Sequence, residues 1–170
     1  HGQVTARADK CLLPAFERFN ETRYFYPAPR PTVWKIGRYR VGVAIGEDLW
    51  TEEASPLKLF IDNPANELAQ KGADLIINLT ASPFHRGKPQ RRLQRLEQIA
   101  AELRKPIALC NCVGVSDEWI FDGYSLAIHT RGSVNYVFPG FKEACGVVDV
   151  SLWEPRGTIS DVVTNTMRAL

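Results

Sequence analysis

The stretch of sequence with the clearest chemical character is Val41–Trp50, which reads VGVAIGEDLW. An apolar run ends at Gly46, and two acids, Glu47 and Asp48, follow it directly. Hydrolases use a sharp turn from a strand into a helix to present the residue at the turn to a pocket. This pattern therefore indicates a reactive position at residue 46, although a plain strand end with a glycine turn fits it too.

Two further groups of polar residues could contribute to the same chemistry. The segment from Asn78 to Lys88 places small polar side chains and a cation directly after an apolar run. Its hydroxyls and Lys88 could line a site, or they could simply be the turn residues at a strand exit. Lys10 precedes an apolar turn, and composition alone predicts that such a lysine lies on the surface.

Other candidate sites receive less support from the sequence. The basic residues of 86–95 are interpreted as a solvated helix face rather than a phosphate or nucleic-acid site, because Arg91 and Arg95 fall on the polar side of an amphipathic helix. The sequence has three histidines, none of them near the polar turns of 116–123, so we expect neither a metal site nor a Ser-His-Asp triad.

The four cysteines fit no zinc-binding spacing. Cys110 and Cys112 lie two apart on a predicted buried strand, where a redox pair is an alternative but inert thiols are the usual outcome. A chain rich in Leu, Ile and Val needs no disulfide to hold its core. We therefore expect reduced thiols and a cytoplasmic location.

Composition excludes several classes of protein. Of the 170 residues, 45% are hydrophobic and 24% charged, which is typical of a folded globular chain. The formal net charge of +2 gives no general electrostatic reason to bind nucleic acid or a membrane surface. No apolar run approaches the roughly 20 residues that a membrane span needs.

The periodicity predicts alternating strands and helices, and therefore a mixed α/β layered sheet. Gln90 to Lys105 is the clearest amphipathic helix, with Leu93, Leu96, Ala100 and Leu103 on one stripe. Chemistry in such sheets gathers at the carboxyl ends of the strands. The other predicted elements are a hairpin of 32–36 and 39–45, a helix start at 55, a helix over 63–72, buried strands 74–79 and 107–113, a hairpin of 124–130 and 133–138, a strand 145–150 and a helix 159–170.

A series of motifs in fixed order resembles one group of enzymes. The chain is similar to the glutaminase domain of bacterial glutamine-dependent NAD synthetases, within the carbon–nitrogen hydrolase (nitrilase) superfamily. The motifs that carry the resemblance are Lys10-x-x-Leu13-Pro14, Glu21-x-Arg23-Tyr24-Phe25, Gly46-Glu47-Asp48-Leu49-Trp50, Asn78-x-x-Ala81-Ser82-Pro83-Phe84 and Gly114-x-x-Asp117-Glu118-x-x-Phe121-Asp122-Gly123-x-Ser125.

The resemblance implies an αββα sandwich in which residues 1–153 are part of the hydrolase domain and 154–170 begin a linker. It also implies that the N-terminal strands of the sandwich are missing, so that the chain alone would be poorly stable or would associate. The implied partners are glutamine, a synthetase domain absent from this chain, and further copies of the chain in a homo-oligomer. ATP and magnesium would belong to that synthetase domain, and we expect no cofactor in this chain.

The resemblance further assigns site residues position by position. Such domains hydrolyse glutamine with a cysteine nucleophile, a glutamate base and a lysine. Lys10 matches that lysine, Gly46 the nucleophile, and the backbone N–H of Glu47 the oxyanion hole. Four positions correspond to residues that contact or line the glutamine site, and they are Phe16, Trp50, Ser82 and Lys88.

The chain departs from the family at its reactive centre. The family pattern has cysteine where this sequence has Gly46, and glycine cannot form an acyl-enzyme. The general-base glutamate belongs to a segment upstream of Lys10 that we expect to be absent. Phe16 stands where family members usually carry tyrosine. Lys88 stands where some members carry arginine. We therefore expect this chain to be inactive, with a non-catalytic binding or assembly module as the alternative.

Overall fold

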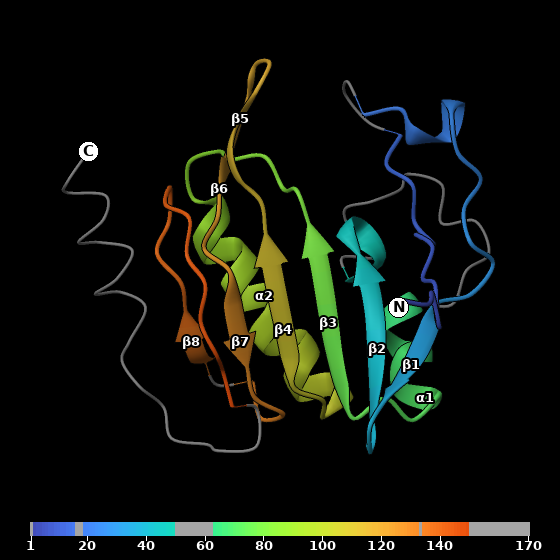
Figure 1. The fold of residues 1–170 in the computed structure, drawn as a ribbon. Helices are drawn as coiled ribbons and strands as arrows, with labels where there is room; N and C mark the ends of the chain where they lie inside the picture. Colours follow the sequence, from blue (N-terminus) through green and yellow to red (C-terminus); the bar gives the residue numbers. More distant parts are fainter. Residues whose placement is uncertain (1, 16–18, 50–62, 133, 150–170) are drawn as a thin grey trace. The chain divides into compact units, whose positions relative to one another are not determined.

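A computed structural model describes residues 2–15, 19–49, 63–132 and 134–149 of the chain. The chain divides into two compact units, His1–Leu79 and Thr80–Leu170. Each unit is described by itself below, and Figure 1 labels its elements.

The first unit is built on a small sheet of mixed direction. Strands β1 (Thr32–Ile36) and β2 (Tyr39–Ile45) form an antiparallel hairpin whose turn contains Gly37 at φ +58°. Strand β3 (Leu75–Thr80) runs parallel to β2, with Ala44 opposite Asn78. Parallel neighbours require a crossover connection, and helix α1 (Pro64–Gln70) lies in it. The predicted hairpin and the mixed α/β class are confirmed.

Helix α1 begins where the sequence signals predict. The side-chain oxygen of Asn63 accepts hydrogen bonds from the N–H groups of Ala65 and Asn66, and Pro64 occupies the first helical position. The helix packs closely on β2, because a Cβ at Gly42 would lie 3.3 Å from the Cβ of Leu68. The start predicted at residue 55 lies outside the described residues.

The second unit contains a long helix, a small antiparallel sheet and a separate hairpin (Figure 1). In the sheet, β7 (Leu126–Ile128) pairs with both β4 (Ile107–Asn111) and β8 (Val134–Val137). The hairpin joins β5 (Val113–Ser116) to β6 (Trp119–Asp122). Helix α2 (Lys88–Leu103) contacts β7. The core is made of Leu96, Ile99, Ala100, Ile107, Leu109, Leu126 and Ile128.

Three sequence-based expectations about strands are wrong. Residues 145–149 form no strand and Val147 is fully exposed, because a valine-rich segment without a paired neighbour stays irregular. The predicted strand 107–113 is two strands, β4 and β5, interrupted at Cys112. Strand β3 is buried on one face only, since Ile76 is buried while Leu79 is 49% exposed.

The cysteines also differ from the prediction in their surroundings. Cys110 and Cys112 are exposed rather than part of a strand buried on both faces, whereas Cys11 is buried. All four cysteines are free thiols in the structure. Burial raises the pKa of the Cys11 thiol to about 12, so this group stays protonated at neutral pH. No helix among the described residues has the length and apolar character needed to cross a membrane.

A buried ion pair lies at the centre of the second unit. Arg92 on α2 donates to the Asp122 carboxylate at 2.9 Å, and their side chains are 2% and 0% exposed. Arg92 also donates to the carbonyl of Gly123, and the side-chain amide of Asn111 donates to Asp122. The prediction of a solvated basic face therefore fails at Arg92, because a residue that faces the core can be charged when its charge is paired.

The buried pair gives a prediction for stability. Replacing Arg92 with Met leaves the Asp122 carboxylate buried without its cation, and we expect the free energy of unfolding to fall by about 3–5 kcal/mol. Arg91 neighbours it on the exposed side of α2, so Arg91→Met is the matched control and should change stability by less than about 0.5 kcal/mol. Urea unfolding measures both, and an Arg92→Met protein as stable as the control would contradict the pair's structural importance.

Candidate active site

The turn after β2 has the geometry that the sequence pattern predicts. The strand ends at Ile45, and the short 3₁₀ helix η2 (Gly46–Leu49) begins at once. Gly46 has φ +52°, in the left-handed region where a glycine meets no steric penalty. The side-chain amide of Asn78, buried on β3, donates to the carbonyl of Gly46 at 3.2 Å. The turn is thus held by the neighbouring parallel strand rather than by a side chain at position 46.

Lys10 lies directly against this turn, although composition alone predicts a surface lysine. A Cβ placed on Gly46 would lie 3.0 Å from the Lys10 Nζ and 3.2 Å from its Cε. The Lys10 side chain is only 17% exposed. A side chain at position 46 would need the flexible end of Lys10 to move by a few tenths of an ångström. The ammonium group therefore occupies the space beside the position that matches the family's nucleophile.

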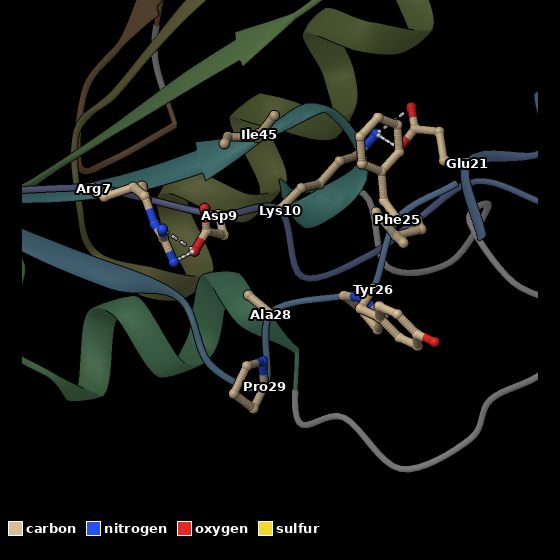
Figure 2. A pocket seen from close by; sticks show the side chains of 12 residues that line it. Arg7, Asp9, Lys10, Glu21, Phe25, Tyr26, Ala28, Pro29 and Ile45 are labelled. Atoms are coloured by element: carbon tan, nitrogen blue, oxygen red, sulfur yellow. Dashed lines mark hydrogen bonds and ion pairs between the residues drawn. The ribbon is translucent and has the colours of Figure 1, made fainter. Parts of the chain in front are cut away.

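Two carboxylates surround the ammonium group of Lys10. Its Nζ lies 2.9 Å and 3.1 Å from the two carboxylate oxygens of Glu21, and 2.5 Å from Oε2 of Glu47. Figure 2 shows the Lys10 side chain extending toward Glu21. Glu21 is the first residue of the short 3₁₀ helix η1 (Glu21–Arg23). The sequence alone assigns it no function. Its place in the Glu21-x-Arg23-Tyr24-Phe25 motif was the only available signal.

These contacts determine the charge state of Lys10. Burial lowers the pKa of Lys10, but the hydrogen bonds and charges of Glu47 and Glu21 outweigh burial and raise this pKa above its ordinary value. The group is therefore a cation at neutral pH and cannot act there as a base.

A pocket of about 670 Å³ opens beside Lys10 within the first unit. Lys10, Glu21 and Ile45 contribute to its wall, and Phe25 and Tyr26 add aromatic surface (Figure 2). A volume of this size accommodates a small organic molecule. The backbone N–H of Glu47 belongs to the first turn of η2, where N–H groups have no partner inside the helix.

The remaining predicted site residues fall in the second unit or outside the described residues. Ser82 and Lys88 belong to the second unit, where the Ser82 N–H donates to Oδ1 of Asn111 and the Lys88 Nζ donates to the carbonyl of Pro83. Phe16 and Trp50 lie outside the described residues. Among the residues that the structure describes, no group of three or more His, Cys, Asp or Glu side chains is arranged to hold a metal ion.

Comparison with known proteins gives relatives of one kind. No protein-family model matches the chain. Glutamine-dependent NAD(+) synthetase from Synechocystis is 35% identical over 89% of this chain and 27% of the relative, and the enzyme of the same name from Thermotoga maritima is 37% identical over 90% and 25%. The chain thus spans about a quarter of the length of the curated relatives it matches.

Solved structures agree with these relatives. Glutamine-dependent NAD+ synthetase from Acinetobacter baumannii aligns with a TM-score of 0.75 and 34% identity, over 84% of this chain and 25% of that one. An amidase of the nitrilase superfamily from Nesterenkonia aligns with a TM-score of 0.58 at 21% identity, over 72% and 42%, which shows a shared fold alone. The resemblance carried by the ordered motifs is therefore confirmed: this chain is homologous to part of the glutamine-dependent NAD+ synthetases and has the nitrilase-superfamily fold.

Proposed function

We propose that this chain corresponds to the glutaminase region of a glutamine-dependent NAD+ synthetase and that, with Gly46 in place of a nucleophile, it does not itself hydrolyse glutamine. The observation that carries the assignment is the Lys10 ammonium packed against the strand-to-helix turn at residue 46. A cation beside a sharply turned strand end is what amide hydrolysis through a covalent intermediate requires.

The chemistry that this framework would support is nucleophilic acyl transfer. A thiolate at position 46 would attack the side-chain amide carbon of glutamine, forming a C–S bond and a tetrahedral oxyanion. The protonated Lys10 and the N–H of Glu47 would stabilise that oxyanion. The general-base glutamate that the resemblance implies would pass the proton of the thiol to the amide nitrogen, so that the intermediate expels ammonia and leaves a thioester, which water would then hydrolyse to glutamate.

Gly46 removes the first step of this sequence. Glycine has no atom that can form the C–S bond, and the loss of a catalytic nucleophile costs on the order of a millionfold in kcat. The packing around position 46 would accommodate a side chain, because the nearest atoms to a Cβ belong to the flexible end of Lys10. The left-handed φ of residue 46 would impose strain of about 1–3 kcal/mol on any other residue.

We extend the proposal to the other predicted site residues and to the partners of this chain. Ser82, Lys88, Phe16 and Trp50 would contact or line the glutamine site. A synthetase region, using ATP and magnesium, would receive the ammonia, and this chain would carry no cofactor of its own. We further propose a homo-oligomer in the cytoplasm.

A second candidate is a non-catalytic module that binds glutamine or another part of the synthetase without turnover. Gly46 favours it, because the framework around Lys10 persists although the reactive side chain is missing. A restored thiol separates the glutaminase assignment from a module that binds another part of the synthetase, because only a glutamine site would direct the thiol at a glutamine-like electrophile.

The assignment is tested by restoring the nucleophile. We expect the Gly46→Cys protein to form a covalent adduct at residue 46 with a glutamine analogue that carries an electrophilic ketone in place of the amide. The parent and the matched control Gly46→Ala should form none, and neither should release glutamate from glutamine above the blank rate. Peptide mass spectrometry and a glutamate assay give the readouts.

Two results would contradict the proposal. Glutamate release by the parent above the Gly46→Ala rate would show that the chain is active without a side chain at position 46. A Gly46→Cys protein that folds but remains unmodified at residue 46 would contradict the glutaminase assignment and favour the non-catalytic module.

The carboxylates around Lys10 give a pH-dependent prediction. Because the pKa of Lys10 is raised in the folded protein, its contribution to stability is fully present below the ordinary lysine pKa and is lost as pH rises through the raised value. Glu21→Gln removes one carboxylate, so at pH 8 it should lower the free energy of unfolding by about 1 kcal/mol. This deficit should shrink at higher pH as Lys10 loses its charge.

Urea unfolding from pH 8 to pH 11 measures this deficit in the parent and the Glu21→Gln protein. Glu102 is exposed on α2, so Glu102→Gln serves as the matched control with no pH-dependent deficit. A Glu21→Gln deficit that stays constant across this range would show that the Lys10 charge is not what Glu21 stabilises.

A further inference from the structure

The carboxylate of Asp48 binds three backbone N–H groups from two separate stretches of chain. Its Oδ1 accepts from Cys11 at 2.9 Å and from Leu12 at 2.7 Å, while its Oδ2 accepts from Ile45 at 3.1 Å. Asp48 is 1% exposed, so water does not compete effectively for these bonds. One buried side chain on η2 therefore joins the two stretches.

The positions of the three donors give this carboxylate its significance. Cys11 and Leu12 directly follow Lys10 in the chain, and Ile45 directly precedes Gly46. Asp48 thus fixes the backbone on one side of the lysine and on one side of the turn. The two segments whose side chains would meet in catalysis are held together by a residue that contributes no atom to the reaction.

Few backbone hydrogen bonds hold the segment around Lys10, whose other anchors are the buried Cys11 side chain and the ion pair of Lys10 with Glu47. Residues 2–15 contain no helix or strand, so no ladder of backbone hydrogen bonds fixes them. Ala28 donates to the Lys10 carbonyl at 2.8 Å, and Glu21 donates to the carbonyl of Pro14 at 3.1 Å. These bonds tie the segment to residues 20–28, and the Asp48 carboxylate links it by hydrogen bonds to the turn at residue 46.

Burying this carboxylate has an energetic cost. Burial raises the pKa of Asp48, although the N–H groups of Leu12, Ile45 and Cys11 and the charge of Lys10 all act to lower it. The three hydrogen bonds therefore do not fully compensate the lost hydration.

We propose that Asp48 is the positioning residue that sets Lys10 against position 46. It acts through the backbone N–H groups of Cys11, Leu12 and Ile45 and touches no substrate. The proposal rests on the function proposed above only for the catalytic role of Lys10. The placement of Lys10 by Asp48 can be tested without glutamine.

The test compares the reactivity of individual lysines in the parent, Asp48→Asn and a control variant. Asn is close in shape to Asp, but it replaces one acceptor oxygen with an NH₂ group, which faces an N–H donor and cannot bond to it. Asp74 also accepts a backbone N–H, that of Arg40, in the same unit but away from Lys10, so Asp74→Asn is the matched control. Each protein is treated with trace acetic anhydride at pH 8, and acetylation is quantified by peptide mass spectrometry.

Two other lysines of the first unit serve as internal references. Lys35 on β1 is exposed and reports the reactivity of a solvated amine. Lys71 donates to the carbonyl of Pro31 at 2.7 Å and pairs with Glu67 at 2.9 Å, so it reports whether the unit as a whole has loosened.

In the parent we expect Lys10 to react about tenfold more slowly than Lys35, because it is buried and ion-paired and becomes available through local opening. Asp48→Asn should raise the Lys10 rate at least about threefold while Lys71 stays at its parent value. Asp74→Asn should leave all three rates unchanged.

Two outcomes would overturn the proposal. A Lys10 rate in folded Asp48→Asn equal to that of the parent would show that other contacts position the lysine. A parallel rise at Lys10 and Lys71 would show that Asp48 supports the whole unit and has no specific effect on Lys10.

A second variant, Asp48→Glu, tests the positioning of Lys10 if Asp48→Asn does not fold. Asp48→Glu keeps the charge but displaces the carboxylate by one methylene, so we expect the Lys10 rate to rise with Lys71 unchanged. An unchanged Lys10 rate would overturn the proposal here too. Failure of the electrophile trapping described above would contradict the glutaminase assignment and leave these lysine rates as an independent measure of positioning.

Discussion

The geometry of the candidate site depends on the hydrogen bonds that the buried Asp48 carboxylate accepts. Asp48 and Cys11 are 37 positions apart in the chain, yet a single buried side chain holds the backbone next to Lys10 and the backbone next to Gly46. Asn78 supports the same turn from the adjacent parallel strand by donating to the carbonyl of Gly46. None of these bonds uses the side chain of residue 46, which explains how the turn persists with glycine there.

The electrostatics of the site follow from that placement. Once Lys10 lies at the turn, Glu21 and Glu47 surround its ammonium group and keep it protonated. A fixed cation whose side chain is largely buried suits the stabilisation of an oxyanion, and it has no value without a nucleophile to create one. Under the proposed function, the chain thus combines a framework for amide hydrolysis with the absence of the atom that would start it. This combination accounts for the similarity to glutamine-dependent synthetases and for the inactivity that we propose.

The parts of the fold that could be predicted from the sequence are those determined by local signals. The hairpin of β1 and β2, the Asn63 cap and most of α2 follow from turn residues, capping and periodicity. The failures concern contacts between distant residues. Arg92 is buried because Asp122, thirty positions away, pairs with it, and no periodic pattern contains that information. Residues 145–149 read as a strand, but a strand requires a neighbour that local sequence does not specify.

The candidate site shows the same division between local and distant information. The turn at Gly46 was predictable from an apolar run that ends in glycine and two acids. The place of Lys10 in the same site was implied by the family resemblance alone, and its contacts with Glu21 and Glu47 and the role of Asp48 were not predicted. Hydrogen exchange followed by NMR tests this arrangement most directly, through the amide protons of Cys11, Leu12 and Ile45. We expect all three amide protons to exchange at least about a hundredfold more slowly than those of an unstructured peptide, because each is hydrogen-bonded to a buried carboxylate. Exchange of the Cys11 and Leu12 amides at unstructured rates would contradict the claim that Asp48 holds Lys10 at the turn.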